Sequence, residues 1–226
     1  MSEVADHALA RLVSLLPLAS RQASLPRELR VLHRAILRSL AERGRPLSDP
    51  EIQALMPDHS PSVVLWTLAA EDLVVMKHGR TLVGAYPLTT EPTPHEVLIN
   101  GNRLWAMCAM DALAVAPLFD ASVDIASECP VTGAAIRLSM KGEQLVDVTP
   151  GPSVQLGIRW RDPYTCAARN FCPGIMFLRD VEAAQRWQNG RVADHDFAPL
   201  PVAVEVAARF FRPFFVDAPA PAYAMA

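Results

Sequence analysis

The sequence predicts an α+β protein in which an N-terminal helical, winged-helix-like domain, residues 1–90, precedes a mixed, largely antiparallel β-sheet domain flanked by helices, residues 91–226. In the first part, apolar residues recur at helical spacing and are followed by a hairpin pattern. The stretch Thr89–Pro94 is polar and rich in proline, as linkers are. Beyond it, several stretches alternate apolar and polar residues between turn signals, which favours antiparallel hairpins.

Composition and charge exclude several classes of protein. The chain has 226 residues, of which 51% are apolar, and this is enough to bury a substantial core. Its formal net charge of -3 offers no basic surface for nucleic acid or an anionic membrane. No apolar run reaches the length of a membrane span, and Glu3 and Asp6 stand where a signal peptide carries basic residues. We therefore expect a cytoplasmic protein that binds neither membranes nor nucleic acid.

The cysteines are expected to be free thiols or ligands of a soft metal, because disulfides are rare in a reducing cytoplasm. There are four of them: Cys108, Cys129, Cys166 and Cys172. None forms a Cys-x-x-Cys pair, and no His-x-x-His or HExxH motif accompanies them. We therefore expect no structural zinc site.

Helices and a hairpin are predicted before the linker. They are residues 3–16, Glu28–Arg43, a short helix capped by Ser48, Ser60–Asp72, and the paired strands Leu73–Met76 and Thr81–Tyr86. Glu51 lies three residues after Ser48, which is the spacing of a capping box. The last three helices and the hairpin follow one another in the order of a winged helix.

A winged helix often binds DNA through its third helix. Here the segment from Asp58 to Asp72 contains three acidic residues and no Lys or Arg. Phosphate contacts supply much of the affinity for DNA, and an acidic helix repels them. We therefore expect this domain to be a module that packs against the second domain.

The second domain contains an apolar segment with an unusual pair of polar residues. We predict a helix from Arg103 to about Phe119, capped by Asn102 and bent or stopped near Pro117. Residues three apart share a helix face, so Cys108 and Asp111 are expected to lie side by side on an apolar surface. The alternative is simple core packing, in which the thiol acts as a small apolar group and the carboxyl is a satisfied polar neighbour.

The other predicted elements of this domain are mostly strands. Strands are predicted at His95–Ile99, Ala121–Ser127, Ala134–Met140, Leu145–Thr149 and Ser153–Trp160. The segment Asn170–Leu178 reads as a loop that leads into a buried strand, and helices are predicted at Val181–Gln188 and Val202–Phe211. The Ala- and Pro-rich end, residues 218–226, is expected to fray.

Three segments, in this order, resemble the alkylmercury lyases, also called organomercurial lyases. Leu104–Leu113 is similar to the family's segment with Cys and Asp three apart, and Ser127–Gly133 is similar to its Cys-x-x-Thr-Gly turn. Asn170–Phe177 is similar to its Phe-Cys segment before a buried strand. The resemblance spans nearly the whole chain. In some members another cysteine follows the last of these cysteines, whereas here Pro173 and Gly174 follow, which changes the loop geometry.

The resemblance implies a lyase that cleaves the carbon–mercury bond of R–Hg–X by protonolysis, giving R–H and Hg(II), and so detoxifies organomercurials. It implies that Cys108 and Cys172 bind mercury and that Asp111 carries the proton and lies near the metal. It also implies that no cofactor is needed, that Hg(II) is bound only as product, and that small thiols or a mercuric reductase accept it.

The chemistry of these residue types agrees with that role. Soft metals select thiolate ligands, and a second thiolate makes the mercury-bound carbon more basic. A carboxyl group can then deliver the proton to that carbon. Its pKa is expected to be raised by the apolar surroundings, which are predicted to be Trp105, Met107, Met110 and Leu113.

Other readings of the same residues remain open. A soft-metal carrier could hold Hg(II) or Cu(I) on Cys108 and Cys172 without turnover, but Asp111 then has no use. A metal-responsive winged-helix regulator is disfavoured by the acidic third helix. A Cys–His hydrolase is disfavoured because no histidine lies in a segment that suggests a partner. We expect Cys129 to be structural and Cys166 to be a bystander in an exposed loop.

Overall fold

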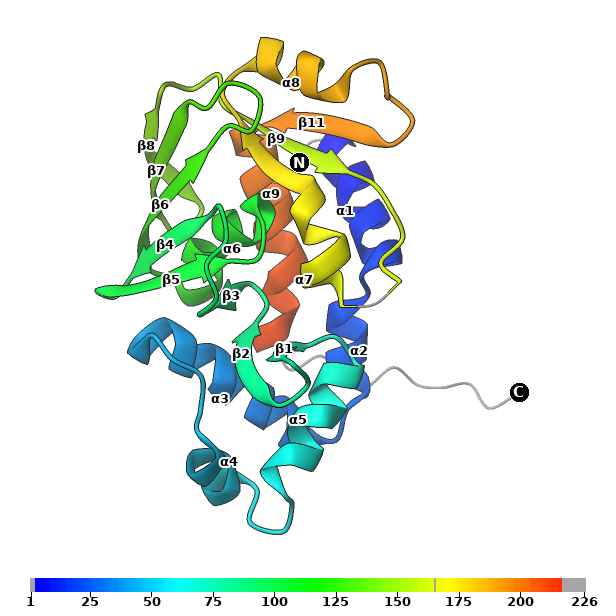
Figure 1. Cartoon of the computed structure of the whole chain (residues 1–226), viewed down its shortest axis with the longest axis vertical. Coiled ribbons are helices and arrows are strands. Elements are labelled where there is room, and N and C mark those ends of the chain that lie inside the picture. The colour runs from blue at the N-terminus through cyan, green and yellow to red at the C-terminus, as the bar shows by residue number, and fades with distance from the viewer. Residues whose placement is uncertain (1–2, 165, 217–226) are drawn as a thin grey trace.

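The computed structural model describes residues 3–164 and 166–216. These residues form an α+β fold with one large and one small antiparallel sheet and with helices between and around them (Figure 1). The predicted α+β class with antiparallel sheets is therefore confirmed. The expected fraying of residues 218–226 falls outside the described residues.

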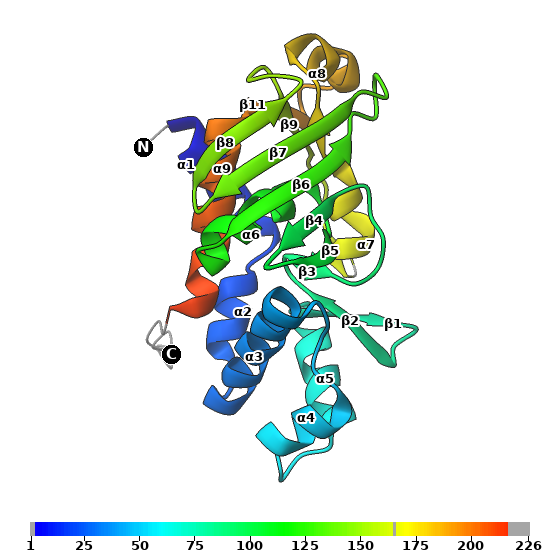
Figure 2. The same cartoon turned by 90° about the vertical axis from the view of Figure 1, so that its left-hand side faces the viewer.

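The large sheet has eight strands in the order β1-β2-β3-β5-β4-β6-β7-β8, and every neighbouring pair is antiparallel (Figure 2). The strands are β1 (Val74–Lys77), β2 (Thr81–Ala85), β3 (Leu88–Thr89), β4 (Glu96–Ile99), β5 (Asn102–Ala106), β6 (Ser122–Glu128), β7 (Ala135–Lys141) and β8 (Gln144–Thr149). The predicted β1–β2 hairpin and the hairpins after residue 120 are present. The short strand β3 joins β2 to β5, so the sheet continues across position 90, and the division into two domains at that position stays a prediction.

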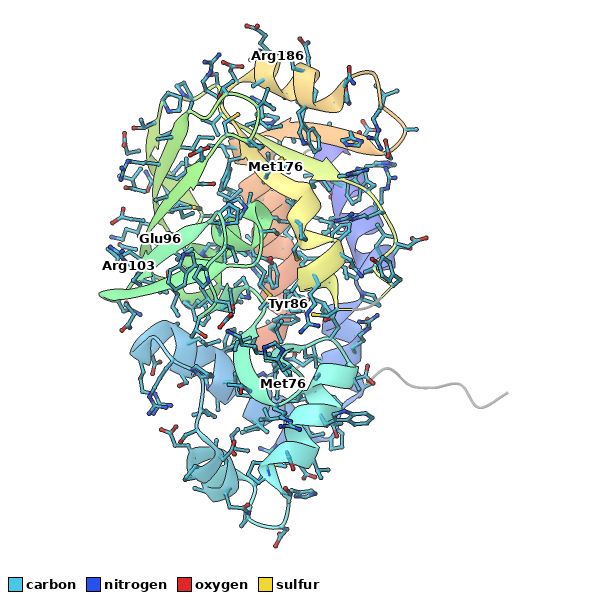
Figure 3. All side chains as sticks on the ribbon, in the orientation of Figure 1. Met76, Tyr86, Glu96, Arg103, Met176 and Arg186 are labelled. Carbon is cyan, nitrogen blue, oxygen red and sulfur yellow. The ribbon has the colours of Figure 1, made fainter. Side chains whose placement is uncertain are left out.

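The predicted helix from Arg103 is wrong in its first part. Asn100 and Gly101 both have positive φ and form the two-residue turn that returns β4 into β5. Asn-Gly is a strong hairpin signal, and here it overrides the helix propensity of the residues that follow. The side chains of Glu96 on β4 and Arg103 on β5 form an ion pair at 3.5 Å (Figure 3).

Five helices precede the sheet: α1 (Glu3–Leu15), α2 (Leu18–Ser24), α3 (Arg27–Arg43), α4 (Asp49–Leu55) and α5 (Pro61–Ala70). All but α2 were predicted. α2 lies between Pro17 and Pro26 and has only two fully buried side chains, Leu18 and Gln22. Such a short segment leaves too few positions for a helical period to be recognised.

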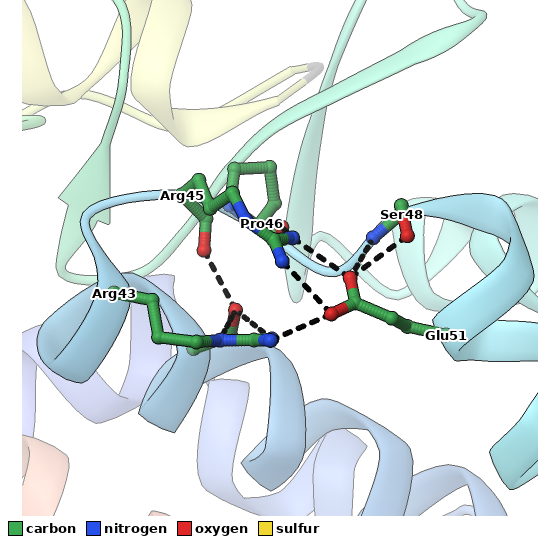
Figure 4. A network of polar contacts seen from close by, with 6 residues as sticks. Arg43, Arg45, Pro46, Ser48 and Glu51 are labelled. Atoms are coloured by element: carbon green, nitrogen blue, oxygen red, sulfur yellow. Dashed lines mark hydrogen bonds and ion pairs between the residues drawn. The ribbon is translucent and has the colours of Figure 1, made fainter.

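The corner between α3 and α4 is held by one carboxylate (Figure 4). Glu51 Oε2 accepts the backbone N–H of Ser48 at 2.7 Å, which confirms the predicted capping box. Its two oxygens also accept hydrogen bonds from the guanidinium groups of Arg43 and Arg45. Gly44, with φ of 67°, ends α3 in the left-handed conformation that lets the chain turn there.

The central helix α6 (Ala109–Phe119) is covered on two sides. It contacts β5, β6 and β7 of the large sheet on one side and α9 (Leu200–Phe211) on the other (Figures 1 and 2). Every residue from Ala109 to Ala116 is buried. Pro117 lies within the helix, near its C-terminal end. α1 packs along α9, so the two ends of the described chain meet.

The small sheet has the order β10-β9-β11, with strands β9 (Gln155–Arg159), β10 (Ile175–Leu178) and β11 (His195–Pro199). Two helices and two 3₁₀ turns complete the fold: α7 (Ala167–Asn170), α8 (Val181–Gln188), Cys172–Gly174 and Arg212–Phe215. α7, β3 and β11 were not predicted: α7 and β3 have only four and two residues, and β11, His-Asp-Phe-Ala-Pro, does not alternate apolar and polar residues along its length and ends in proline. No helix among the described residues is both long and apolar enough to span a bilayer.

Gly84 on β2 offers a test of the packing in the middle of the large sheet. A Cβ atom there would lie 2.6 Å from the carbonyl oxygen of Leu88 and 2.9 Å from Cε of Met107. The Gly84→Ala variant should therefore be less stable by about 1–3 kcal/mol, because the backbone of Leu88 must shift. Urea unfolding monitored by circular dichroism measures this change. Thr81→Ala on the same strand, at an exposed position, is the control and should change stability by less than ~0.5 kcal/mol.

Candidate active site

Two thiols and a carboxyl meet in the core beside the large sheet. The sulfur atoms of Cys108 and Cys172 and a carboxylate oxygen of Asp111 all lie within 4.8 Å of one another. All three side chains are buried, with relative exposures of 1%, 4% and 2%. The structure thus brings together the three residues that the sequence singled out, although 61 positions separate Asp111 from Cys172 along the chain.

The start of α6 places two of these groups. Cys108 is the N-cap residue of α6, with extended backbone geometry, and its sulfur accepts the backbone N–H of Asp111 at 3.4 Å. We predicted that both residues would lie on one face of a longer helix. They are neighbours instead because a cap side chain folds back over the first turn, where Asp111 lies. The third group, Cys172, comes from the 3₁₀ turn that follows α7.

Burial controls the proton affinities of Cys108, Asp111 and Cys172, which we call the trio. The pKa of Asp111 is raised to about 7, because removal from water disfavours the charged carboxylate, while contacts with the two cysteines partly oppose this. The pKa of the Cys108 thiol is raised to about 11, mainly by burial. The pKa of the Cys172 thiol lies well above its ordinary value because of its contact with Cys108 and its burial. At neutral pH both sulfurs are therefore protonated, and Asp111 exchanges its proton readily.

A hydrogen bond links the trio internally. Cys172 Sγ lies 3.6 Å from Oδ2 of Asp111, to which it donates. The carboxylate of Asp111 is therefore within reach of thiol protons. The direction predicted for the pKa of Asp111 from its apolar surroundings is confirmed.

A pocket of about 280 Å³ leads to the trio, and Cys172 is the member that lines it. Apolar side chains dominate the rest of the lining, including Met107, Pro130, Ile175 and Met176. Of the four residues predicted to form an apolar wall, only Met107 lines this pocket. Trp105 lies on strand β5, because the helix begins after it, and Met110 and Leu113 are buried in the core.

His95 also lines this pocket, and sequence reasoning did not find it. Its Nδ1 lies 2.9 Å from the hydroxyl of Ser127, and its ring packs edge-on against Phe177. Burial lowers the pKa of His95 to about 4, so the ring is neutral at pH 7. No local motif could have revealed this position, because pairing of β4 with β6 brings His95 and Ser127 together.

The two other cysteines are also free thiols, as the sequence predicted. Cys129 is buried at the turn between β6 and β7, where its backbone N–H donates to Ala134 O at 2.9 Å. Cys166 is half-buried at the start of α7, and its sulfur lies 3.6 Å from the hydroxyl of Tyr86. It is thus less exposed than we predicted for a loop residue.

A polar cluster missed by the sequence analysis fixes the segment that carries Cys172. The carboxylate of Asp72 accepts the backbone N–H of Ala167 at 2.9 Å, and the hydroxyl of Tyr86 accepts that of Ala168 at 2.7 Å. Tyr86 in turn donates to Asp72 at 3.1 Å. These contacts tie the first turn of α7 to the end of α5 and the end of β2.

Comparisons with known proteins agree with one another. A family model described as alkylmercury lyase matches residues 88–212. The alkylmercury lyase of Staphylococcus epidermidis is 34% identical over 159 residues, which cover 70% of this chain and 71% of that protein. The alkylmercury lyase of Streptomyces lividans is 31% identical over 174 residues, which cover 76% and 77%.

A solved structure shares the fold. The crystal structure of the mercury-bound form of MerB2 superposes with a TM-score of 0.76. The match covers 91% of this chain and 98% of that one, at 24% sequence identity. At this identity the match supports the fold alone.

The raised pKa of Asp111 makes stability depend on pH. Its pKa is about 7 in the folded protein against an ordinary value of 3.8, so its contribution to stability is complete below pH 3.8 and lost as the pH rises to 7. The amide of the Asp111→Asn variant does not ionise, so the variant does not lose this contribution to stability as the pH rises. Relative to the wild-type protein, it should therefore gain up to about 4 kcal/mol between pH 4 and pH 8, at ~1.4 kcal/mol per pKa unit.

Urea unfolding of the reduced protein at pH 4, 6 and 8 measures this difference. Asp147→Asn, at an exposed position on β8, is the control and should follow the wild-type pH dependence. A difference between Asp111→Asn and wild type that is the same at all three pH values would show that Asp111 ionises normally.

Proposed function

The chain belongs to the alkylmercury lyase family, and on that premise we propose that it cleaves the carbon–mercury bond of organomercurials, with Cys108, Asp111 and Cys172 as the catalytic residues. The observation that carries this assignment is the buried cluster of the three, whose ligand atoms lie within 4.8 Å. Two thiolates suit the soft Hg(II) ion, and a carboxyl with pKa near 7 suits proton transfer to carbon.

The reaction begins at Cys172, because this thiol lines the pocket. The Hg–X bond of R–Hg–X breaks, a bond forms between mercury and the sulfur of Cys172, and the thiol proton leaves with X as H–X. Cys108 then gives its proton to the carboxylate of Asp111 and becomes the second sulfur ligand. The raised pKa values of both thiols do not prevent this, because mercury displaces the proton from the sulfur it binds.

Asp111 completes the reaction. Protonated Asp111 donates to the mercury-bound carbon, the carbon–mercury bond breaks, and R–H leaves. The carboxylate is thereby restored, and Hg(II) stays on two sulfurs. Charge is balanced at each step, because the proton taken from Cys108 is the proton given to carbon. Burial favours the protonated carboxyl, which is the form needed for donation.

Release of the product needs other thiols. Two small thiol molecules can exchange with Cys108 and Cys172, taking Hg(II) as a dithiolate and returning both protons. A mercuric reductase is a further acceptor that we propose for the cell, with the cytoplasm as the compartment. Every proton and ligand in this scheme comes from the chain, the substrate or a small thiol, so we propose that no cofactor takes part.

The N-terminal part has a supporting role in this proposal. Its helices α3, α4 and α5 and the β1–β2 hairpin follow the order of a winged helix, and we propose that residues 1–90 form such a packing module. α5, the third of these helices, contains no Lys or Arg that could contact DNA phosphates. Instead, Asp72 and Tyr86 hold the backbone that leads to Cys172.

A non-catalytic carrier of soft metal ions is the alternative function. It would need Cys108 and Cys172 but would gain nothing from a buried carboxyl. Burying Asp111 costs stability whenever it ionises, so its position between the thiols favours a role in proton transfer. Hydrocarbon release separates the two functions.

We expect Cys108→Ser and Cys172→Ser each to abolish hydrocarbon release, because each removes one sulfur ligand. Asp111→Ala should still bind mercury but should cleave at least ~100-fold more slowly, the usual scale of a lost general acid. Headspace gas chromatography of methane or benzene, from methylmercury or phenylmercury with excess thiol, measures turnover. Cys166→Ser is the matched control and should retain activity. Wild-type turnover in Cys108→Ser or Cys172→Ser would contradict the assignment.

The order of thiol engagement is a separate prediction. In a Cys129→Ser, Cys166→Ser background, iodoacetamide should modify Cys172 faster than Cys108, because only Cys172 lines the pocket and Cys108 is 1% exposed. Peptide mass spectrometry over a time course identifies which residue reacts first. Faster modification of Cys108 would reverse the first step of the scheme.

A further inference from the structure

A second hollow adjoins the Cys172 pocket. It has a volume of about 220 Å³ and shares three lining residues, Thr93, Met107 and Ala168, with that pocket. In Figure 3, Met176, which lines the first pocket, lies above Tyr86, and Met76, which lines the second hollow, lies below it. The two hollows therefore adjoin at these three shared residues.

Three charged residues, Lys77, Glu91 and Arg169, are among those that line the second hollow, which is otherwise mostly apolar. Lys77 Nζ lies 2.8 Å from the carboxylate of Glu91, and both residues line the hollow. Arg169 also lines it, and its Nη2 donates to the carbonyl oxygen of Met76 at 2.8 Å, which fixes the guanidinium at the rim. Two cations against one carboxylate leave a positive excess. The second hollow therefore suits an anionic group, whereas no Lys or Arg lines the mostly apolar Cys172 pocket, which suits a hydrocarbon.

Met107 lies between the two hollows, since it lines both of them. Its Cε would lie 2.9 Å from a Cβ atom on Gly84, so the side chain extends from the link between β5 and α6 across to β2. Methionine is unbranched and changes rotamer readily. A ligand whose mercury reaches Cys172 can therefore extend past Met107 into the second hollow.

We propose that this second hollow is a subsite for the small thiol that carries the organomercurial, and that it selects thiols with a carboxylate. The inference rests on the proposed function. In R–Hg–S–R′, the R group lies in the Cys172 pocket, and the carboxylate of R′ contacts Arg169 and Lys77. The Hg–S bond to R′ breaks, a bond to Cys172 forms, and the proton of Cys172 leaves on R′–SH.

The test compares methylmercury presented as its complexes with 3-mercaptopropionate and with 2-mercaptoethanol, which are similar in length and differ in charge. The measured quantity is the ratio of kcat/KM for the anionic complex to that for the neutral one, from methane release. We expect this ratio to exceed one in the wild-type protein and to fall about threefold in Lys77→Gln and in Arg169→Gln. It should rise in Glu91→Gln, since the competing carboxylate is removed. Added salt should reduce all these differences.

Arg186→Gln on α8, where the arginine lines neither hollow, is the control and should keep the wild-type ratio. Misfolding cannot produce opposite changes in Lys77→Gln and Glu91→Gln. A ratio that is equal in all variants, or that shifts in one direction in all of them, would overturn the subsite. If neither complex releases methane, the proposed function fails. Isothermal titration of the same two complexes then measures the ratio of their binding constants. If the subsite exists, this ratio should fall in Lys77→Gln and Arg169→Gln and rise in Glu91→Gln.

Discussion

Removal of the Asp111 carboxyl from water is the constraint on which the site depends. In water this group would be ionised at neutral pH and would hold no proton to give. Burial under the large sheet and α9 raises its pKa to about 7, so that the carboxyl can both take a proton from a thiol and return it. The long apolar run of α6, which has no polar side chain other than Asp111 between Ala109 and Ala116, provides this dry environment.

The same burial sets the division of labour between the two sulfurs. Cys108 caps α6 and is fixed by the N–H of Asp111, whereas Cys172 stands in a short turn that borders the pocket. One thiol is thus deep and the other is reachable. In the proposed reaction, mercury that enters the pocket meets Cys172 first and then binds Cys108 beside the Asp111 carboxyl.

Sequence reasoning found the chemistry of the site more easily than its geometry. A thiol and a carboxyl three residues apart are conspicuous in an apolar run, but it was the resemblance to the alkylmercury lyases that indicated a role for Cys108 and Asp111 and that added Cys172. The predicted helix began too early, at Arg103, because Asn100-Gly101 is a strong hairpin signal that was not recognised. His95, Tyr86 and Asp72 could not be predicted, since strand pairing and long-range contacts place them, and neither leaves a local pattern.

The contacts of Asp72 and Tyr86 with Ala167 and Ala168 also bear on how the protein is made. The segment that leads to Cys172 is tied at Ala167 and Ala168 to two residues that precede it by more than eighty positions. During synthesis Asp72, Tyr86, Cys108 and Asp111 are therefore all made before Cys172, which follows Cys108 by 64 residues. The cluster of Cys108, Asp111 and Cys172 is thus assembled late in synthesis, once the segment from Ala167 has docked against Asp72 and Tyr86.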